Sequence, residues 1–427
     1  MRDTVQLLVS NVRLLLFSVY AIICFHFTEI KFYDVKLNEL VSLLAIPFLL
    51  LMVRRMNKYI LYFLAFFVFI LITTFLANLS HTFYLDINGI SLLKKPYMIS
   101  IARFLEYMAC LVFAAITYKT VTFYTDRGKP VSFVLKTVLK LNVLISFIFI
   151  ATYLLAAFKV IDLHQSKLLY DATPYREPTI RLRGFYVEGG PLGLLYCFLF
   201  ILASLLKEKK WFYQAVFFIV IIMAKSKAGL IGVIAWMSYK FYRKFEHTSW
   251  LKPIVILLIL PVFLAAFVKI ADEYIYLLSN VETVLPEHRT DNNFVMGRIA
   301  AVFIAPNMFL ENPFFGIGLG NYALLRNAPE YLGIWPAVTE WDAPGLGVFA
   351  SLLIENGIVG FSVFAILLYS IYKGYAGVSS MAGQLIMLFV LIGMLGVQLH
   401  FLYIWFLIGL ALAVPVNKYK QEHEQAG

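Results

Sequence analysis

Residues 59–77, with the sequence YILYFLAFFVFILITTFLA, contain no charged side chain. An α-helix needs about 20 mostly apolar residues to cross the hydrocarbon core of a bilayer, so this run predicts a membrane-spanning helix. The whole chain has the same character, because 61% of its 427 residues are hydrophobic and 14% are charged. Soluble domains are about 45–50% apolar and about 25% charged. The sequence therefore predicts an integral membrane protein that crosses the bilayer many times.

The apolar runs predict an all-α polytopic membrane protein with about twelve transmembrane helices in one membrane domain, residues 1–427. The expected spans are residues 11–27, 37–53, 58–78, 97–117, 133–158, 191–206, 211–224, 228–243, 252–270, 346–372, 381–398 and 400–416. Two segments between spans are long, residues 159–190 and residues 271–345. Long loops are usually functional or unstructured, and the second is rich in Trp, Tyr, Gly and Pro. We expect that one to fold, with short amphipathic helices such as one near 298–310.

Basic side chains indicate the orientation of the chain. The formal net charge is +11, which on a soluble protein would suggest a nucleic acid or an acidic partner. Here Lys and Arg gather in every second short loop between the expected spans, so each loop expected inside is basic, as the positive-inside rule requires. We therefore expect no nucleic-acid partner, two cytoplasmic termini, and both long loops on the outer side. Lys94 and Lys95 fall outside against this trend, and we expect them to reach lipid headgroups.

Neither a metal nor a cofactor is expected. The three cysteines, Cys24, Cys110 and Cys197, each lie in an apolar run and have neither metal-ligand spacing nor a disulfide pattern. The sequence has no Walker loop, which disfavours ATP-driven transport. The GxGxG stretch at 316–320 does not follow a strand in a βαβ unit, so it predicts a turn rather than a dinucleotide site.

The first long loop carries three arginines, Arg176, Arg181 and Arg183, ahead of glycines and a helix start. Arginine is a fork-shaped donor suited to phosphate oxygens, and a helix start exposes backbone N–H groups to an anion. Glu188 lies at that helix start, where a carboxylate can act as a general base or bind a hydroxyl. The alternative is a solvated loop in which Arg and Glu side chains pair with each other.

Further charged groups are expected on the outer side. Lys227 lies in a tight turn with Lys225, either near an anion or simply solvated. The second long loop holds His288, Arg289 and Arg298, and its nine acidic side chains outnumber its three arginines. An acidic loop with a few arginines suits neutral sugar hydroxyls together with one local anion, although part of the acidity serves solubility.

Two polar groups lie in or beside the expected spans. Arg103 and Glu106 are three residues apart on one helix, and we expect them to pair with each other. His400 lies between the last two apolar stretches, where a polar turn residue at the outer face is the simplest interpretation.

Four stretches, in one order along the chain, carry a resemblance to a known family. They are Arg183-x-Phe-Tyr-x-Glu188; Ser226-Lys227; Arg298 followed by Glu311-Asn-Pro-Phe-Phe-Gly-Ile-Gly-Leu-Gly-Asn321; and Leu352-Leu-Ile-Glu355-Asn-Gly357-Ile-Val-Gly360. Together they resemble the O-antigen polymerase and O-antigen ligase superfamily over roughly residues 180–372. The second stretch departs from the pattern, since the family usually has Ser-Arg there.

This resemblance implies a C-type glycosyltransferase-like fold and chemistry at the periplasmic face of the bacterial inner membrane. It implies an undecaprenyl-diphosphate-linked oligosaccharide as the donor, with the lipid diphosphate as leaving group, and it leaves open a chain-length regulator as a protein partner. Basic side chains would hold the diphosphate, and a carboxylate or imidazole would take the acceptor's proton. The basic candidates are Arg176, Arg181, Arg183, Lys227, Arg289 and Arg298, and the base candidates are Glu188, His288 and Asp342.

One departure favours a polymerase over a ligase. Ligases of this superfamily carry a His-Asn pair at positions that are Leu346 and Gly347 here. A ligase that transfers polysaccharide to lipid A core remains the first alternative. A polysaccharide or lipid flippase is the non-enzyme alternative, but it predicts pseudo-symmetric halves and the sequence shows no repeat. A peptidoglycan glycosyltransferase of the shape-and-division type shares the architecture, but its residue pattern is not found.

The orientation can be tested with single cysteines in a background that lacks the three native ones. Cysteines at Ser166 and Asn292 should react with a membrane-impermeant maleimide in intact spheroplasts, because both positions lie in loops expected outside. A cysteine at Lys209, in an expected inner loop, should react only after permeabilisation. The opposite labelling pattern would show an inverted protein.

Overall fold

The computed structural model describes residues 2–32, 35–47, 49, 56–84, 90–160, 181–186, 188–244, 276, 279–287, 295–375 and 380–414. These residues are mostly helical, as the sequence predicts. A small exception is the antiparallel pair of strands β1 (Lys31–Phe32) and β2 (Val35–Lys36), in which Lys31 lies opposite Lys36.

A helix lies in every expected span except 252–270, which lies outside the described residues. In the expected span 37–53 the helix covers the first eight residues, and residues 48 and 50–53 lie outside the described ones. The helices are α1 (Arg2–His26), α2 (Leu37–Leu44), α4 (Lys58–Asn78), α5 (Met98–Thr125), α6 (Val131–Ala157), α7 (Gly189–Ser204), α8 (Lys210–Met223), α9 (Lys227–Lys244), α16 (Val348–Gly374), α17 (Met381–Met394) and α18 (Leu402–Ala413). Among the described residues, four helices, α4, α5, α6 and α16, are long and apolar enough to cross a membrane. Shorter apolar helices lie in α1, α7, α8, α17 and α18. The chain is thus an α-helical membrane protein, and the number twelve stays a prediction.

The helix α4 shows why these runs fold as they do. The Asn57 side chain caps the helix by accepting a hydrogen bond from the backbone N–H of Tyr59 at 3.0 Å. One face of α4 is buried at Phe63 and Phe67, while apolar side chains such as Leu76 are exposed on the other face. Exposing a continuous apolar face to water is unfavourable, so this face of α4 is consistent with contact with lipid.

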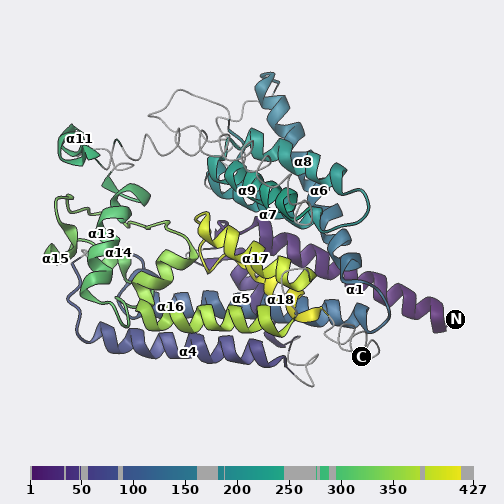
Figure 1. The fold of residues 1–427 in the computed structure, drawn as a ribbon, viewed down its shortest axis with the longest axis horizontal. Helices are drawn as coiled ribbons and strands as arrows, with labels where there is room; N and C mark the ends of the chain where they lie inside the picture. Colours follow the sequence, from purple (N-terminus) through teal and green to yellow (C-terminus); the bar gives the residue numbers. More distant parts are fainter. Residues whose placement is uncertain are drawn as a thin grey trace.

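The core is built around α18, whose residues are buried along the whole helix. It contacts α5, α17 and α1, and Figure 1 shows it in the middle of the bundle. A helix that is apolar on all sides is one that other helices surround. The approach of α5 is close at Gly409, where a Cβ atom would lie 2.5 Å from the carbonyl oxygen of Ala114.

The long segment before α16 is also folded. It contains α11 (Val281–Glu287), α13 (Arg298–Glu311), α14 (Tyr322–Leu325) and α15 (Pro329–Leu332), and α13, α14 and α15 gather at one end of the molecule in Figure 1. A second hydrophobic cluster, which includes Met308, Tyr331 and Trp335, holds them together. A helix does run over 298–310, but its outer face keeps the apolar Val302 and Leu310 exposed, so it is less amphipathic than expected.

The close packing at Gly409 predicts a stability effect. Replacing Gly409 with Val should lower the melting temperature in detergent, because a side chain there overlaps Ala114 and Thr117 and overpacking costs about 1–3 kcal/mol. Ala151→Val, on an exposed part of α6, is the matched control and should change the melting temperature little. Equal melting temperatures for the two variants would contradict this account of the core.

Candidate functional site

Two of the quoted sequence stretches interlock through their backbones. Within α16, Gly357 has φ +62°, so the helix is broken there, and a Cβ atom would lie 2.3 Å from the backbone of Phe314. The segment 313–318 pairs with this break through four backbone hydrogen bonds, from Ile317 to Ile354, Gly318 to Glu355, Ile358 to Pro313 and Val359 to Phe314, at 2.8–3.2 Å. The pairing fixes the loop against the helix and requires glycine at 357.

The rest of the glycine-rich loop runs between α4 and α5. The Leu319 N–H donates to Thr74 Oγ1 at 2.9 Å, and the Leu319 carbonyl accepts from Ser100 Oγ at 3.2 Å. Gly320 lies against α5, where a Cβ atom would approach the Arg103 side chain at 3.1 Å. The Gly320 N–H lies close to the Glu355 carboxylate. The loop thereby brings α5 and α16 to one place and holds Glu355 there.

A cavity of about 670 Å³ opens beside this loop. Segments far apart in the sequence line it: residues 28–43, α5, the start of α7, Arg298, residues 341–345 and the loop between α17 and α18. Its wall combines basic and acidic side chains with apolar ones, and the acidic ones are Glu29, Glu39 and Glu106. The basic group is Lys31, Lys36, Lys94, Arg103 and Arg298, and the apolar group includes Leu40, Leu43, Leu93, Met98, Ile101 and Leu105. A pocket of this size is in the range that binds small ligands, about 300–1,000 Å³.

Four charged side chains form a cluster in the wall of this large cavity. Lys36 Nζ lies 2.7 Å from Glu39 and 2.8 Å from Glu106, and Arg103 lies 2.5 Å from Glu106. The expected ion pair of Arg103 and Glu106 is therefore confirmed. Glu39 of α2 and Lys36, which precedes α2, complete the cluster. The formal charges of the cluster cancel, which offsets part of the cost of placing them inside the bundle.

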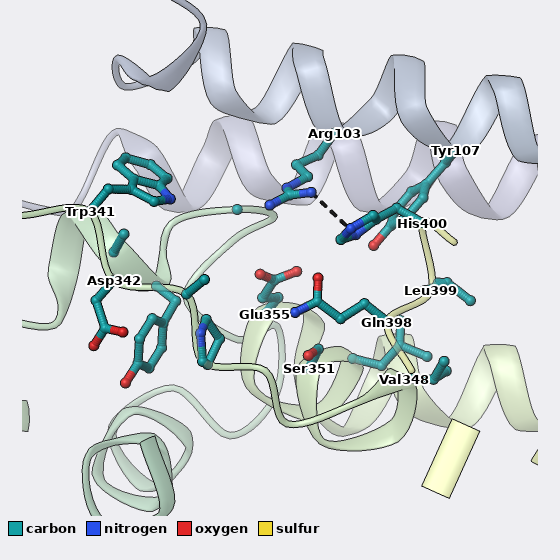
Figure 2. A pocket seen from close by; sticks show the side chains of 16 residues that line it. Arg103, Tyr107, Trp341, Asp342, Val348, Ser351, Glu355, Gln398, Leu399 and His400 are labelled. Atoms are coloured by element: carbon teal, nitrogen blue, oxygen red, sulfur yellow. Dashed lines mark hydrogen bonds between the residues drawn. The ribbon is translucent and has the colours of Figure 1, made fainter. Parts of the chain in front are cut away.

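His400 joins this charge cluster through Arg103. The Arg103 guanidinium donates to His400 Nδ1 at 3.2 Å, drawn as the dashed line in Figure 2. Arginine cannot accept a hydrogen bond, so Nδ1 is the acceptor and the ring proton lies on Nε2. His400 does lie in a turn, as the sequence predicts, and its mostly buried side chain is part of the cavity wall.

A small polar hollow of about 40 Å³ adjoins the large cavity. Figure 2 shows Glu355 and Ser351 of α16 facing Gln398 and His400 of the loop after α17. The two spaces share five lining residues, Arg103, Trp341, Ala343, Gln398 and His400. A water needs roughly 10–15 Å³ of such volume, so the hollow has space for a hydroxyl arm or a few waters but not a sugar ring.

Asp342 also lines the small polar hollow, but its carboxylate is engaged elsewhere. Oδ1 accepts the backbone N–H of Gly297 at 2.7 Å, and Oδ2 lies 3.4 Å from Nε of the buried Arg326. In Figure 2 its carboxylate points away from Glu355. Burial raises the pKa of Asp342, against the opposing influence of the Gly297 N–H and Arg326. Its contacts tie α13 to the loop before α16.

Of the basic residues singled out from the sequence, Arg298 lies at the large cavity. Its side chain packs on Gly345, where a Cβ atom would lie 3.2 Å from Arg298 Cγ. Arg181 Nε donates to the carbonyl of Ala224 at 2.8 Å and so ties its segment to the turn after α8. Arg183 is half-buried, and Lys227 is exposed at the start of α9.

Glu188 is exposed at the N-terminus of α7. Among the described residues, neither Glu188 nor Arg181, Arg183 or Lys227 lines the large cavity or the small polar hollow. Arg176, His288 and Arg289 lie outside the described residues. The structure therefore brings Arg298 and Asp342 to the cavities and places the described members of the first loop apart from them.

Ser226 explains the second sequence stretch structurally. Its Oγ donates to the Gly190 carbonyl at 3.1 Å and accepts the Gly229 N–H at 3.2 Å. The same side chain fills the space beside Gly193 of α7. This stretch therefore joins the starts of α7 and α9.

Sequence reasoning missed Lys36, Glu39 and Glu355 as site residues. Glu355 had a usable signal, because an acidic residue inside an apolar span usually faces an interior cavity. Lys36 and Glu39 had none, since they precede or begin an ordinary apolar run.

Residues 212–365 match the model of a protein family described as O-antigen ligase. That segment resembles the O-antigen ligase family. The matched part runs from α8 into α16 and includes Arg298, Asp342 and Glu355. The match supports the O-antigen polymerase and ligase superfamily, whose members transfer glycosyl groups, and it does not distinguish polymerase from ligase. No curated protein matches the chain.

The charge cluster predicts that Glu106→Gln is strongly destabilising. Without this carboxylate, Lys36 keeps its ion pair with Glu39, but Arg103 loses its ion-pair partner, and breaking a buried ion pair costs on the order of 3 kcal/mol. A clear drop of the melting temperature in detergent is the expected result. The matched control is Glu208→Gln, which removes an exposed partner of Lys136 and should change the melting temperature little. A drop no larger than that of the control would count against the cluster.

Proposed function

We propose that this protein polymerises undecaprenyl-diphosphate-linked oligosaccharide repeat units by glycosyl transfer at the periplasmic face of the bacterial inner membrane. The single observation that carries the proposal is the large cavity, whose wall joins five basic and three acidic side chains to apolar ones inside a membrane protein. A polyprenyl diphosphate has the same two chemistries, a doubly phosphorylated head and a hydrocarbon tail. The family match supports the class of reaction.

Basic side chains at the cavity suit the diphosphate. Arg298 and Lys31 are exposed, and Lys94 lies over the Trp341 ring at 5.1 Å, so all three can reach a ligand in the cavity. Phosphate oxygens bind such donors through charge-assisted hydrogen bonds. Lys36 is already shared between two carboxylates and is less available.

These positive charges also explain how the bond would break. When the anomeric C–O bond opens, its electron pair leaves with the lipid diphosphate, and negative charge grows on the phosphate oxygens. Fixed positive groups that meet this charge in a partly dry cavity lower the barrier. The donor is already activated by its diphosphate, so the reaction needs no nucleotide sugar.

Leu346 and Gly347 favour the polymerase over the ligase. Leu346 packs against the hydrophobic cluster that holds α13 and α15, and neither residue carries a group that can transfer a proton. A ligase that transfers finished polysaccharide to lipid A core is the alternative, and it would need a different base.

The proposal can be tested by expressing the protein in a strain that lacks its own polymerase and supplies the cognate repeat unit. A ladder of lipopolysaccharide bands on a gel is the expected result. A single repeat unit on lipid A core in every lane would reject the polymerase assignment.

Arg298 should be essential for this polymerisation. Arg298→Ala removes a donor that meets the leaving diphosphate, and the loss of one such donor costs about 100-fold or more in rate. Arg298→Lys should restore little, because an ammonium group cannot reproduce the two parallel contacts of a guanidinium. The control is Arg127→Ala, at the exposed turn after α5, which should keep the ladder. An intact ladder in Arg298→Ala would remove this residue from the site.

A further inference from the structure

We propose that Glu355 is the general base that takes the proton from the acceptor sugar hydroxyl, and that the small polar hollow is the place where this hydroxyl enters. The inference rests on the proposed glycosyl transfer. It assigns the base to a side chain inside the bundle instead of one in a loop.

Glu355 differs from the other carboxylates of these cavities in what surrounds it. Glu39 and Glu106 are bound to Lys36 and Arg103, and Asp342 is bound to Arg326. Glu355 forms no ion pair within the part of the chain that the structure describes, although it is half-buried and lines the hollow. A carboxylate held in an ion pair is a weaker proton acceptor, so Glu355 is the better base.

Backbone contacts fix the position of Glu355, and Arg103 adds an electrostatic attraction. Its own carbonyl accepts the N–H of Gly318 at 2.9 Å, and the N–H of Gly320 lies close to its carboxylate. The break at Gly357 lies just beyond it. A base must stay within hydrogen-bond reach of the proton it removes. These backbone contacts hold Glu355 in place without an ion pair that would neutralise its carboxylate.

His400, the other basic group of the hollow, is less suited to the role. Its Nδ1 already accepts a hydrogen bond from Arg103, and its Nε2 carries the ring proton. To accept a second proton it would have to give up the Arg103 contact. Arg103 instead places a positive charge at the boundary shared by the two spaces.

The sizes of the two spaces suit a hydroxyl that approaches from the large cavity. The saccharide occupies the cavity of about 670 Å³, and only a hydroxyl arm enters the hollow of about 40 Å³. Glu355 accepts the hydroxyl proton, and the freed oxygen forms the new bond to the anomeric carbon of the donor. The old C–O bond breaks, and its electron pair leaves on the lipid diphosphate. Glu355 is then protonated and releases the proton to water.

The test compares purified wild-type protein with Glu355→Gln, Glu355→Asp and Glu208→Gln on a lipid-diphosphate repeat unit. Three quantities are measured for each: polymer formation, binding of the repeat unit, and melting temperature. We expect Glu355→Gln to lose about 100-fold to 10,000-fold in rate, the usual contribution of a general base, with binding and melting temperature close to wild type. Glu355→Asp should keep part of the activity, and its rate should depend on pH differently from that of the wild type. Glu208→Gln, exposed and remote from the cavities, should behave as wild type.

Each other outcome overturns a distinct statement. Near wild-type rates in Glu355→Gln, with an active wild type, would remove Glu355 as the base and leave the polymerase function standing. Loss of binding in both Glu355 variants would make it a positioning residue and would also end the inference. A wild-type protein that neither binds nor polymerises the repeat unit would reject the proposed function itself.

Discussion

The backbone pairing of segment 313–318 with the broken helix α16 is the interaction on which the site depends. An intact helix would use the N–H groups of Ile358 and Val359 internally, but the break at Gly357 releases them to Pro313 and Phe314. Buried backbone groups must find partners, most of all in a membrane protein. The break and the loop therefore require each other, and together they set where Glu355 stands.

A second constraint comes from charge inside an apolar bundle. Arg103 and Glu106 lie on a helix long and apolar enough to cross the membrane, where an isolated charge is expensive. Lys36 and Glu39 balance them, so α2 and α5 are joined by ion pairs in addition to apolar contacts. This neutral cluster forms one wall of the large cavity and leaves the exposed basic groups, Lys31 and Arg298, to meet a ligand.

The helices were predictable because an apolar run of helix length has few other structures open to it in a membrane. Residues 58–78 were expected as a span, and α4 has those same bounds. The site was much less predictable, because Lys36, Arg103 and His400 come from separate segments and meet only through helix packing. Local patterns drew attention to Arg183 and Glu188, since Arg, Gly and Glu beside a helix start suggest an anion site. In the structure, Gly190, which follows that stretch, accepts a hydrogen bond from Ser226, and this contact joins α7 to α9.

In the described part of this protein, carboxylates that form ion pairs have a structural role, and Glu355, which forms none there, has the proposed catalytic role. A carboxylate whose charge is cancelled by lysine or arginine holds elements together, as Glu106 does for α2 and α5 and Asp342 does for the loop before α16. A carboxylate that forms no ion pair keeps more of its capacity to take a proton. Among the described residues Glu355 is in that state, because the interlocked backbone fixes its position and Arg103 acts on it electrostatically without forming an ion pair. The glycines at 318, 320 and 357 are therefore part of the chemistry, since the fold they permit lets an acidic side chain remain reactive inside the bundle.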